Sequence, residues 1–152
     1  MNKYFELRYL SNNFLKKYPE IDYPEFENKK TRSYIVFLIQ VDNHTFAIPF
    51  RTNMNHKYGY IFLTSGRKTN SKAGLDFTKA VLVDDFSMLG AEAIIDNKER
   101  LEISEKHFFI RKKFIVYYEN YKRYLKHELN EYQSKAYYYS TLKYFHKELG
   151  IK

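Results

Sequence analysis

The sequence predicts an α+β domain, in which a strongly curved antiparallel sheet or small barrel comes first and helices follow. Short β-prone runs separated by turn residues fill the first half, and from about Ser104 apolar residues recur at spacings of three and four. A chain of 152 residues is long enough for one core and short for two, and no linker or internal repeat divides it. We therefore expect a single domain over residues 1–152.

The N-terminal segment predicts a strand and a short helix. Residues 3–10 alternate loosely between apolar and polar side chains, as a half-buried strand does. Ser11 and Asn12 then provide caps for a helix that ends before Pro19. A loop over residues 19–32 is expected to follow.

The strongest strand signal is residues 33–41, a continuous β-branched and aromatic run. Asp42 and Asn43 are turn residues, so residues 45–50 are expected to return as the second arm of a hairpin. Further along, the pattern predicts a third strand over residues 58–63, a polar basic loop over residues 64–73 and a short buried fourth strand over residues 79–83.

Helices are predicted in the C-terminal part. Residues 104–107 make a suitable helix start before residues 108–118. Apolar residues then form one stripe, which predicts a long C-terminal amphipathic helix: Leu125, Leu129, Tyr132, Ala136, Tyr139, Leu142, Phe145 and Leu149. The surrounding tyrosines are expected to pack in the core, and stacking on nucleic-acid bases is the alternative.

Composition excludes several classes of protein. Sixteen Tyr and thirteen Phe exclude a disordered polyelectrolyte. The absence of Cys excludes disulfides, a thiolate nucleophile and a cysteine zinc site, and it fits a reducing cytoplasm. No run of about 18 apolar residues is present, and charges occupy the N-terminal segment where an export signal would be apolar, so neither membrane insertion nor export is expected.

Positive charge is concentrated in the middle of the chain. The formal net charge is +8, and residues 30–79 hold eight basic side chains against two acidic ones, which makes a local balance of +6. A basic zone of this kind indicates a polyanionic partner, most simply nucleic acid. The alternative is a solvated surface that is basic for solubility alone.

The end of the second hairpin strand carries the most informative motif. An apolar run through Pro49 is followed at once by Arg51, Thr52, Asn53, Asn55 and His56. Core packing requires none of these groups. A phosphodiester could use a guanidinium for its charge, an imidazole for a proton, and hydroxyls or amides for orientation.

Metal and nucleotide motifs are missing from the sequence. The five His are widely spaced, and no Asp/Glu cluster resembles a two-metal nuclease, so we expect a mechanism without metal or cofactor. The loop over residues 66–74 lacks the Gly-Lys-Ser/Thr ending of a P-loop and is interpreted as a basic loop that touches a backbone. Lys79, which opens the predicted fourth strand, is expected to emerge at a sheet end, with an ordinary solvated lysine as the alternative.

Three segments together resemble a known family. Residues 34–39, 46–56 and 74–80 look like the toxins of type III toxin–antitoxin systems, the AbiQ-like ToxN, CptN and TenpN group, over about residues 1–120. The resemblance implies a curved sheet like that of the MazF and Kid toxins and a metal-independent endoribonuclease. It also implies a pseudoknotted antitoxin RNA, which is processed by the toxin and closes with it into a ring-like assembly.

The chain departs from the family at one point. After the second hairpin strand the ToxN branch carries Thr-Ser followed shortly by Lys. This chain has Arg51-Thr52-Asn53 and then Asn55-His56, closer to the CptN and TenpN branches. Only Thr52 can be matched, and Lys57 is an alternative for the missing lysine.

Residue chemistry and resemblance together predict attack of a ribose 2′-OH on its own 3′-phosphate. His56 is expected to move a proton and Thr52 and Asn53 to orient the nucleotide, while Arg51 and Lys79 stabilise the phosphorane. The predicted RNA-binding residues are Lys30, Arg32, Asn55, Lys57, Lys72, Arg111, Lys112 and Lys113. A non-catalytic RNA-binding module, a DNA-binding regulator and an assembly protein are the remaining alternatives.

Overall fold

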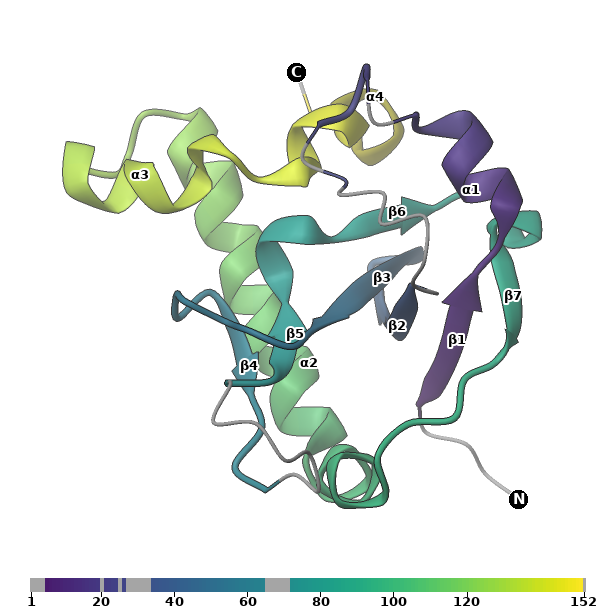
Figure 1. Ribbon diagram of the computed structural model, residues 1–152. Coiled ribbons are helices and arrows are strands. Elements are labelled where there is room, and N and C mark those ends of the chain that lie inside the picture. The colour runs from purple at the N-terminus through teal and green to yellow at the C-terminus, as the bar shows by residue number, and fades with distance from the viewer. Residues whose placement is uncertain (1–4, 20, 25, 27–33, 65–71, 152) are drawn as a thin grey trace.

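A computed structural model describes residues 5–19, 21–24, 26, 34–64 and 72–151. It confirms the α+β class: the described residues form a seven-stranded antiparallel sheet and a long helix (Figure 1). The strand order is β4-β5-β3-β2-β1-β7, and β6 pairs with β3 beside this path. The sheet does not close on itself, so the small-barrel alternative is wrong for the described strands.

The N-terminal prediction is confirmed where the chain is described. Strand β1 (Glu6–Leu10) leads into helix α1 (Asn12–Lys17), whose N-cap Ser11 accepts a hydrogen bond from the backbone N–H of Asn13. β1 pairs with both β2 and β7. The loop predicted over residues 19–32 lies largely outside the described residues.

The central hairpin forms as predicted. Strand β2 (Ile35–Val41) pairs with β3 (His44–Arg51) through six residue pairs, from Val36 with Pro49 to Val41 with His44. Asp42 and Asn43 both have positive φ, 49° and 69°. Two left-handed turn residues match the right-handed twist of the strands, so the sequence Asp-Asn fixes the hairpin register.

The predicted fourth strand, residues 79–83, begins two residues late in the structure, and a further short strand that the sequence did not predict precedes it. β5 (Gly74–Asp76) and β6 (Val81–Val83) both pair with β3, and the 3₁₀ turn η1 (Phe77–Lys79) separates them. Lys79 therefore ends a 3₁₀ turn instead of opening a strand. The interruption matters because it turns the chain out of the sheet beside the end of β3.

The short outer strands complete the sheet. β4 (Gly59–Ile61) occupies only the start of the predicted third strand and pairs with β5. A side chain at Gly59 would place its Cβ 2.1 Å from the carbonyl oxygen of Leu75, so only glycine permits this close pairing. On the other side, the turn η2 (Phe86–Met88) leads into β7 (Leu89–Glu92), which the sequence did not predict.

Helix α2 (Asn97–Leu125) packs on the sheet and begins seven residues before the predicted start at Ser104. Asp96 caps it by accepting hydrogen bonds from the backbone N–H groups of Lys98 and Glu99. Its first six residues bury Glu99 and Glu102 and no apolar side chain, so the apolar periodicity starts late. Further along, Phe114 packs against Phe46 of β3, with ring centroids 5.0 Å apart.

The predicted long C-terminal helix is wrong. Its apolar stripe begins with Leu125 at the end of α2 and continues over α3 (Glu131–Tyr138), the 3₁₀ turn η3 (Thr141–Phe145) and α4 (His146–Leu149). His127 adopts a left-handed conformation with φ 59°, and Asn130 and Gln133 form a capping box that starts a new helix. Two members of the stripe, Tyr132 and Tyr139, point to solvent instead of the core.

Candidate active site at the end of β3

The site is organised by Asp76, the last residue of β5. Its side chain is buried, with 1% exposed, and caps η1 by accepting hydrogen bonds on Oδ1 from the Thr78 backbone N–H (2.9 Å) and hydroxyl (2.6 Å). Gly59, the first residue of β4, pairs with Asp76, and Arg51, the last residue of β3, pairs with Gly74, two residues before Asp76.

Arg51 is held from inside the protein. It is the last residue of β3, and its Nη1 lies 3.0 Å from Oδ2 of Asp76. The Arg51 side chain is still 34% exposed. A guanidinium has five N–H donors, so one donor fixes the group while others are left to meet an anion from solvent.

His56 contacts protein through both ring nitrogens. Nδ1 accepts a hydrogen bond from the Tyr58 backbone N–H (3.0 Å), and Nε2 lies 3.2 Å from Oδ1 of Asp76. An acceptor at Nδ1 places the proton of the neutral ring on Nε2, facing the carboxylate. That N–H is not aligned for a well-formed hydrogen bond, and Nε2 is buried without another partner among the described residues.

The charges of this cluster favour an ionised Asp76. Burial raises the pKa of the carboxyl, but the adjacent His56 ring, the hydrogen bonds from Thr78 and the Arg51 guanidinium together lower the pKa below its ordinary value. The site is therefore a buried anion that fixes one cation and one imidazole. We call Arg51, His56, Asp76 and Thr78 the strand-end cluster.

The predicted polar residues after β3 lie beside the cluster. Thr52, Asn53, Asn55 and Lys57 are all exposed on the segment between β3 and β4. Met54, in the middle of this segment, is buried and its backbone N–H donates to the carbonyl of Lys72 (2.8 Å). This anchor turns the neighbouring polar side chains outward and brings Lys72 next to them. Lys79 is half-buried at the end of η1, three residues after Asp76.

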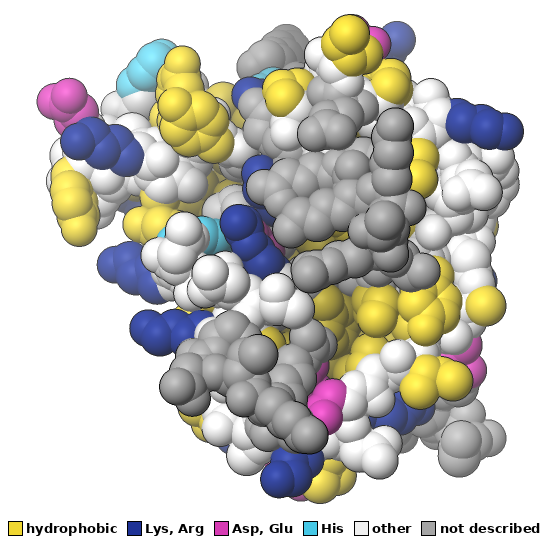
Figure 2. Space-filling model, in the orientation of Figure 1, with side chains coloured by type: hydrophobic (Ala, Val, Ile, Leu, Met, Phe, Trp, Pro, Cys, Tyr) yellow, Lys and Arg dark blue, Asp and Glu magenta, His cyan; other side chains and the backbone are white. Residues whose placement is uncertain are grey.

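The basic residues of α2 do not act as one group. Arg111 donates through Nε to the carbonyl of Gln40 in β2 (2.9 Å), whereas Lys113 lies on the side of α2 that faces β4. Lys112 is exposed between them. Lys30 and Arg32 lie outside the described residues. Figure 2 shows more Lys and Arg side chains on the side of β4 and α3 than on the side of β1 and β7.

Sequence reasoning missed Asp76 and Thr78. One signal was available: Asp76 is one of only two acids between residues 30 and 79, and the spacing Asp-x-Thr is typical of a side chain that caps a turn. A lone acid in a basic segment is a candidate counter-ion for the cations near it. The sequence did not indicate which basic residue forms an ion pair with Asp76.

The described part of the chain offers neither a metal site nor a membrane-spanning helix. No group of three or more His, Asp or Glu side chains there is arranged to hold a metal ion. None of the helices described is both long enough and apolar enough to cross a bilayer. Comparison with protein-family models, curated proteins and solved structures finds no match to this chain.

Proposed function

We propose that this protein is a metal-independent endoribonuclease, of the kind found as toxins in type III toxin–antitoxin systems, and that the strand-end cluster is its active site. The reaction is transesterification within RNA. The ribose 2′-oxygen attacks the adjacent phosphorus, the P–O5′ bond breaks, and the products are a 2′,3′-cyclic phosphate and a 5′-OH.

One observation carries the proposal: a half-exposed arginine is fixed by a buried, ionised carboxylate at the point where polar side chains leave the sheet. A fixed guanidinium stabilises the charge that develops on a phosphorane without reorganising during the reaction. Arg51 takes this role, with Lys79 as a second cation. Thr52 and Asn53, exposed directly after Arg51, orient the scissile nucleotide.

His56 and Asp76 supply the proton transfer. Asp76 faces Nε2–H, which leaves the lone pair of the neutral ring on Nδ1. When RNA displaces the Tyr58 N–H from Nδ1, this nitrogen takes the 2′-OH proton, and the imidazolium that forms is stabilised by the Asp76 carboxylate. The departing 5′-oxygen takes its proton from water.

The proposed partners are RNA in two forms, cellular transcripts that are cleaved and a small pseudoknotted antitoxin RNA that is held across the same site. Lys57 and Lys72 lie beside the cluster and are exposed, so they are placed to contact phosphates on both sides of the scissile one. Toxin and RNA would close into a ring-like assembly, as the resemblance implies.

A non-catalytic RNA-binding module is the second candidate, because the Tyr58 N–H occupies Nδ1 of His56 in the absence of RNA. Such a module would bind the same RNA at the same exposed cations and leave it intact. An assay of cleavage separates the two candidates directly.

The experiment incubates purified protein with a labelled structured RNA in excess EDTA and analyses the ends of any products. We expect cleavage with cyclic-phosphate ends in wild type, a loss of about 10²–10³-fold in Arg51→Ala, and incomplete recovery in Arg51→Lys, which restores charge but not the planar fork. Strict dependence on Mg²⁺, or equal cleavage by all three proteins, would contradict the proposal. Binding without cleavage in wild type would favour the RNA-binding module.

A further inference from the structure

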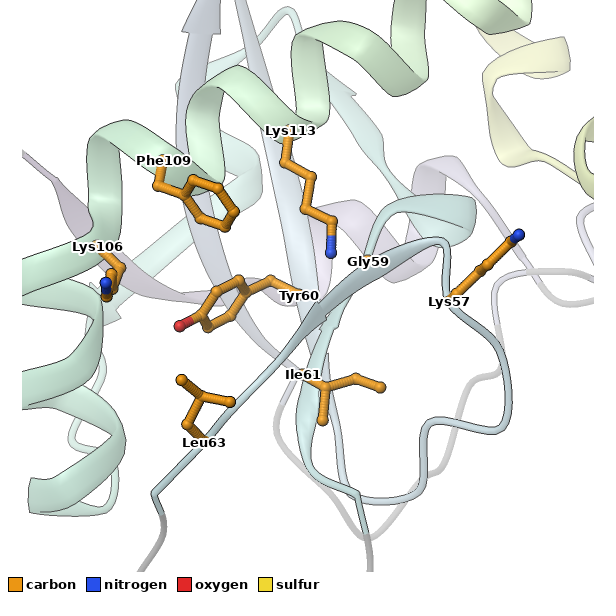
Figure 3. A pocket seen from close by; sticks show the side chains of 8 residues that line it. All are labelled: Lys57, Gly59, Tyr60, Ile61, Leu63, Lys106, Phe109 and Lys113. Carbon is orange, nitrogen blue, oxygen red and sulfur yellow. The ribbon is translucent and has the colours of Figure 1, made fainter.

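A concave site adjoins β4, and it is distinct from the strand-end cluster. It is a cavity of about 400 Å³ between β4 and α2, within the size range of about 300–1,000 Å³ that small-molecule sites occupy. Its lining residues are Lys57, Gly59, Tyr60, Ile61, Leu63, Lys106, Phe109 and Lys113 (Figure 3). None of the roles assigned above uses its aromatic and apolar surface.

Two aromatic rings meet in this cavity, and they differ in how firmly they are held. Tyr60 is buried, and its hydroxyl donates to the buried carboxylate of Glu102, which also binds the backbone N–H groups of Leu63 and Thr64. Phe109 extends from α2 with 54% of its surface exposed, and its ring centroid is 6.2 Å from that of Tyr60 at 74°. One ring is therefore a fixed wall, and the other presents an open face.

The charged groups that line the cavity are all positive. Figure 3 shows Lys113 reaching from α2 toward β4 at one end of the rings and Lys106 at the other end, while Lys57 extends away at the mouth. The lining residues include no Asp or Glu. An exposed aromatic face between two ammonium groups is the combination that single-stranded nucleic-acid sites use, since a base stacks on the ring and its flanking phosphates meet the cations.

We propose that this cavity is a subsite for one unpaired nucleotide of the bound RNA, with the base on Phe109 and the flanking phosphates at Lys106 and Lys113. The inference rests on the proposed function, because it assigns part of the same RNA to a second site. It adds a specificity element that lies outside the reacting centre: RNA with an unpaired base at the right distance is held in register.

The two sites are joined through β4. Gly59 lines the cavity and pairs with Asp76, so the two Cα atoms are about 5 Å apart, as in any antiparallel pair. Lys57, at the mouth of the cavity, directly follows His56 in the sequence. A strand of RNA that leaves the strand-end cluster past Lys57 reaches the cavity within a few nucleotides.

The test uses the absence of Trp from the chain. Phe109→Trp introduces the protein's only indole at the proposed stacking position. Phe108→Trp is the matched control: Phe108 is the neighbouring residue on α2, is similarly exposed at 62%, and does not line the cavity. The ligand is an uncleavable 2′-O-methyl RNA 12-mer of mixed sequence, with an abasic phosphodiester of equal length as a charge-matched probe.

We expect the RNA to quench the emission of Phe109→Trp strongly and that of Phe108→Trp little, and the abasic probe to quench neither. We also expect Phe109→Ala to weaken RNA binding by about 5- to 150-fold. This is the range found when alanine replaces an aromatic side chain on which one base stacks. The double variant Lys106→Ala with Lys113→Ala should lower the salt dependence of binding, whereas Lys98→Ala, also exposed on α2, should not.

Several results would overturn the inference. Equal quenching of the two indoles, or quenching by the abasic probe, would show that no base stacks on residue 109. If Phe109→Ala binds RNA as tightly as wild type, and wild type cleaves RNA, the subsite proposal is wrong and the proposed function is unaffected. Absence of both RNA binding and cleavage in wild type would overturn both, and would favour an acidic peptide as the occupant of this basic cavity.

Discussion

Two buried carboxylates lie near the two ends of β4, and they differ in what they hold. Asp76 contacts a guanidinium, an imidazole and the amide and hydroxyl of Thr78. Glu102 accepts hydrogen bonds from neutral donors, the Tyr60 hydroxyl, the backbone N–H groups of Leu63 and Thr64, and the Thr64 hydroxyl. The first arrangement fixes groups that can bind an anion. The second fixes the Tyr60 ring and the course of the chain after β4.

The comparison shows why burial of an acid does not by itself mark a functional site. Both carboxyl groups have a lowered pKa, because hydrogen bonds outweigh the burial that raises it. Only at Asp76 do the partners include a guanidinium and an imidazole that remain partly exposed. The identity and exposure of the hydrogen-bond donors therefore indicate whether a buried carboxylate has a catalytic role or a structural one.

The largest expected combined effect on cleavage and stability is that of Asp76→Asn. Loss of the charge releases Arg51 and His56 and leaves an unpaired cation, so we expect cleavage to fall by about 10²–10³-fold and the free energy of unfolding by about 3 kcal/mol. RNA cleavage and denaturant unfolding measure the two effects. Asp85→Asn is the control, because Asp85 caps η2 in the same way but is exposed on the surface.

His56→Gln tests the role of the imidazole with less disturbance. The amide of Gln keeps an N–H donor for Asp76 but cannot take up a proton at neutral pH. We expect cleavage to fall by about 10²–10⁴-fold, the usual contribution of a positioned acid or base, while stability changes little. Activity within tenfold of wild type would mean that His56 only positions Asp76.

Glu102→Gln should lower stability and leave cleavage nearly unchanged, which is the opposite of what is expected for His56→Gln. The amide retains acceptors for Leu63 and Thr64 but loses charge-assisted hydrogen bonds, so the free energy of unfolding should fall by about 1–3 kcal/mol. Below the unfolding temperature, cleavage should stay within about fivefold of wild type. A loss of cleavage as large as that of Asp76→Asn would break the distinction between the two acids.

The smallest expected effect is the loss of folding stability at acid pH, where both carboxylates become protonated. A pKa that is lower in the folded state means that the ionised form stabilises the fold above the ordinary values of 4.5 for Glu102 and 3.8 for Asp76. This stabilisation is lost as the pH falls through the folded values. Wild-type stability should therefore decline below about pH 4.5, and each of Asp76→Asn and Glu102→Gln should reduce the decline, as urea unfolding at pH 2–6 can measure.

Local signals explain which elements could be predicted. The Ser11 cap and the Asp42-Asn43 turn act on the residues next to them, so the sequence alone specifies α1 and the hairpin. β5 and β7 have three and four residues, too few for a pattern to be detected. The early start of α2 is marked by the cap at Asp96 and by buried acids, which apolar periodicity ignores.

The sequence predicted where the site lies, but it did not predict which side chains contact one another there. Arg51 and His56 were identified because polar groups that core packing does not need follow an apolar strand. Their common partner Asp76 lies 25 residues after Arg51 in the sequence and meets it only because β5 pairs with β3. The nitrogen that faces the carboxylate depends on the turn at Tyr58, which sequence patterns do not specify.

The turn that carries Thr78 is held from the far end of the chain. The hydroxyl of Thr141 donates to the carbonyls of Thr78 (3.2 Å) and Ala80 (2.6 Å), and Thr141 follows Thr78 by 63 residues. At about 5–20 residues per second, a ribosome takes roughly 3–13 seconds to make that stretch. During synthesis, the nascent chain therefore holds every residue of the strand-end cluster for seconds before it holds the support beneath η1.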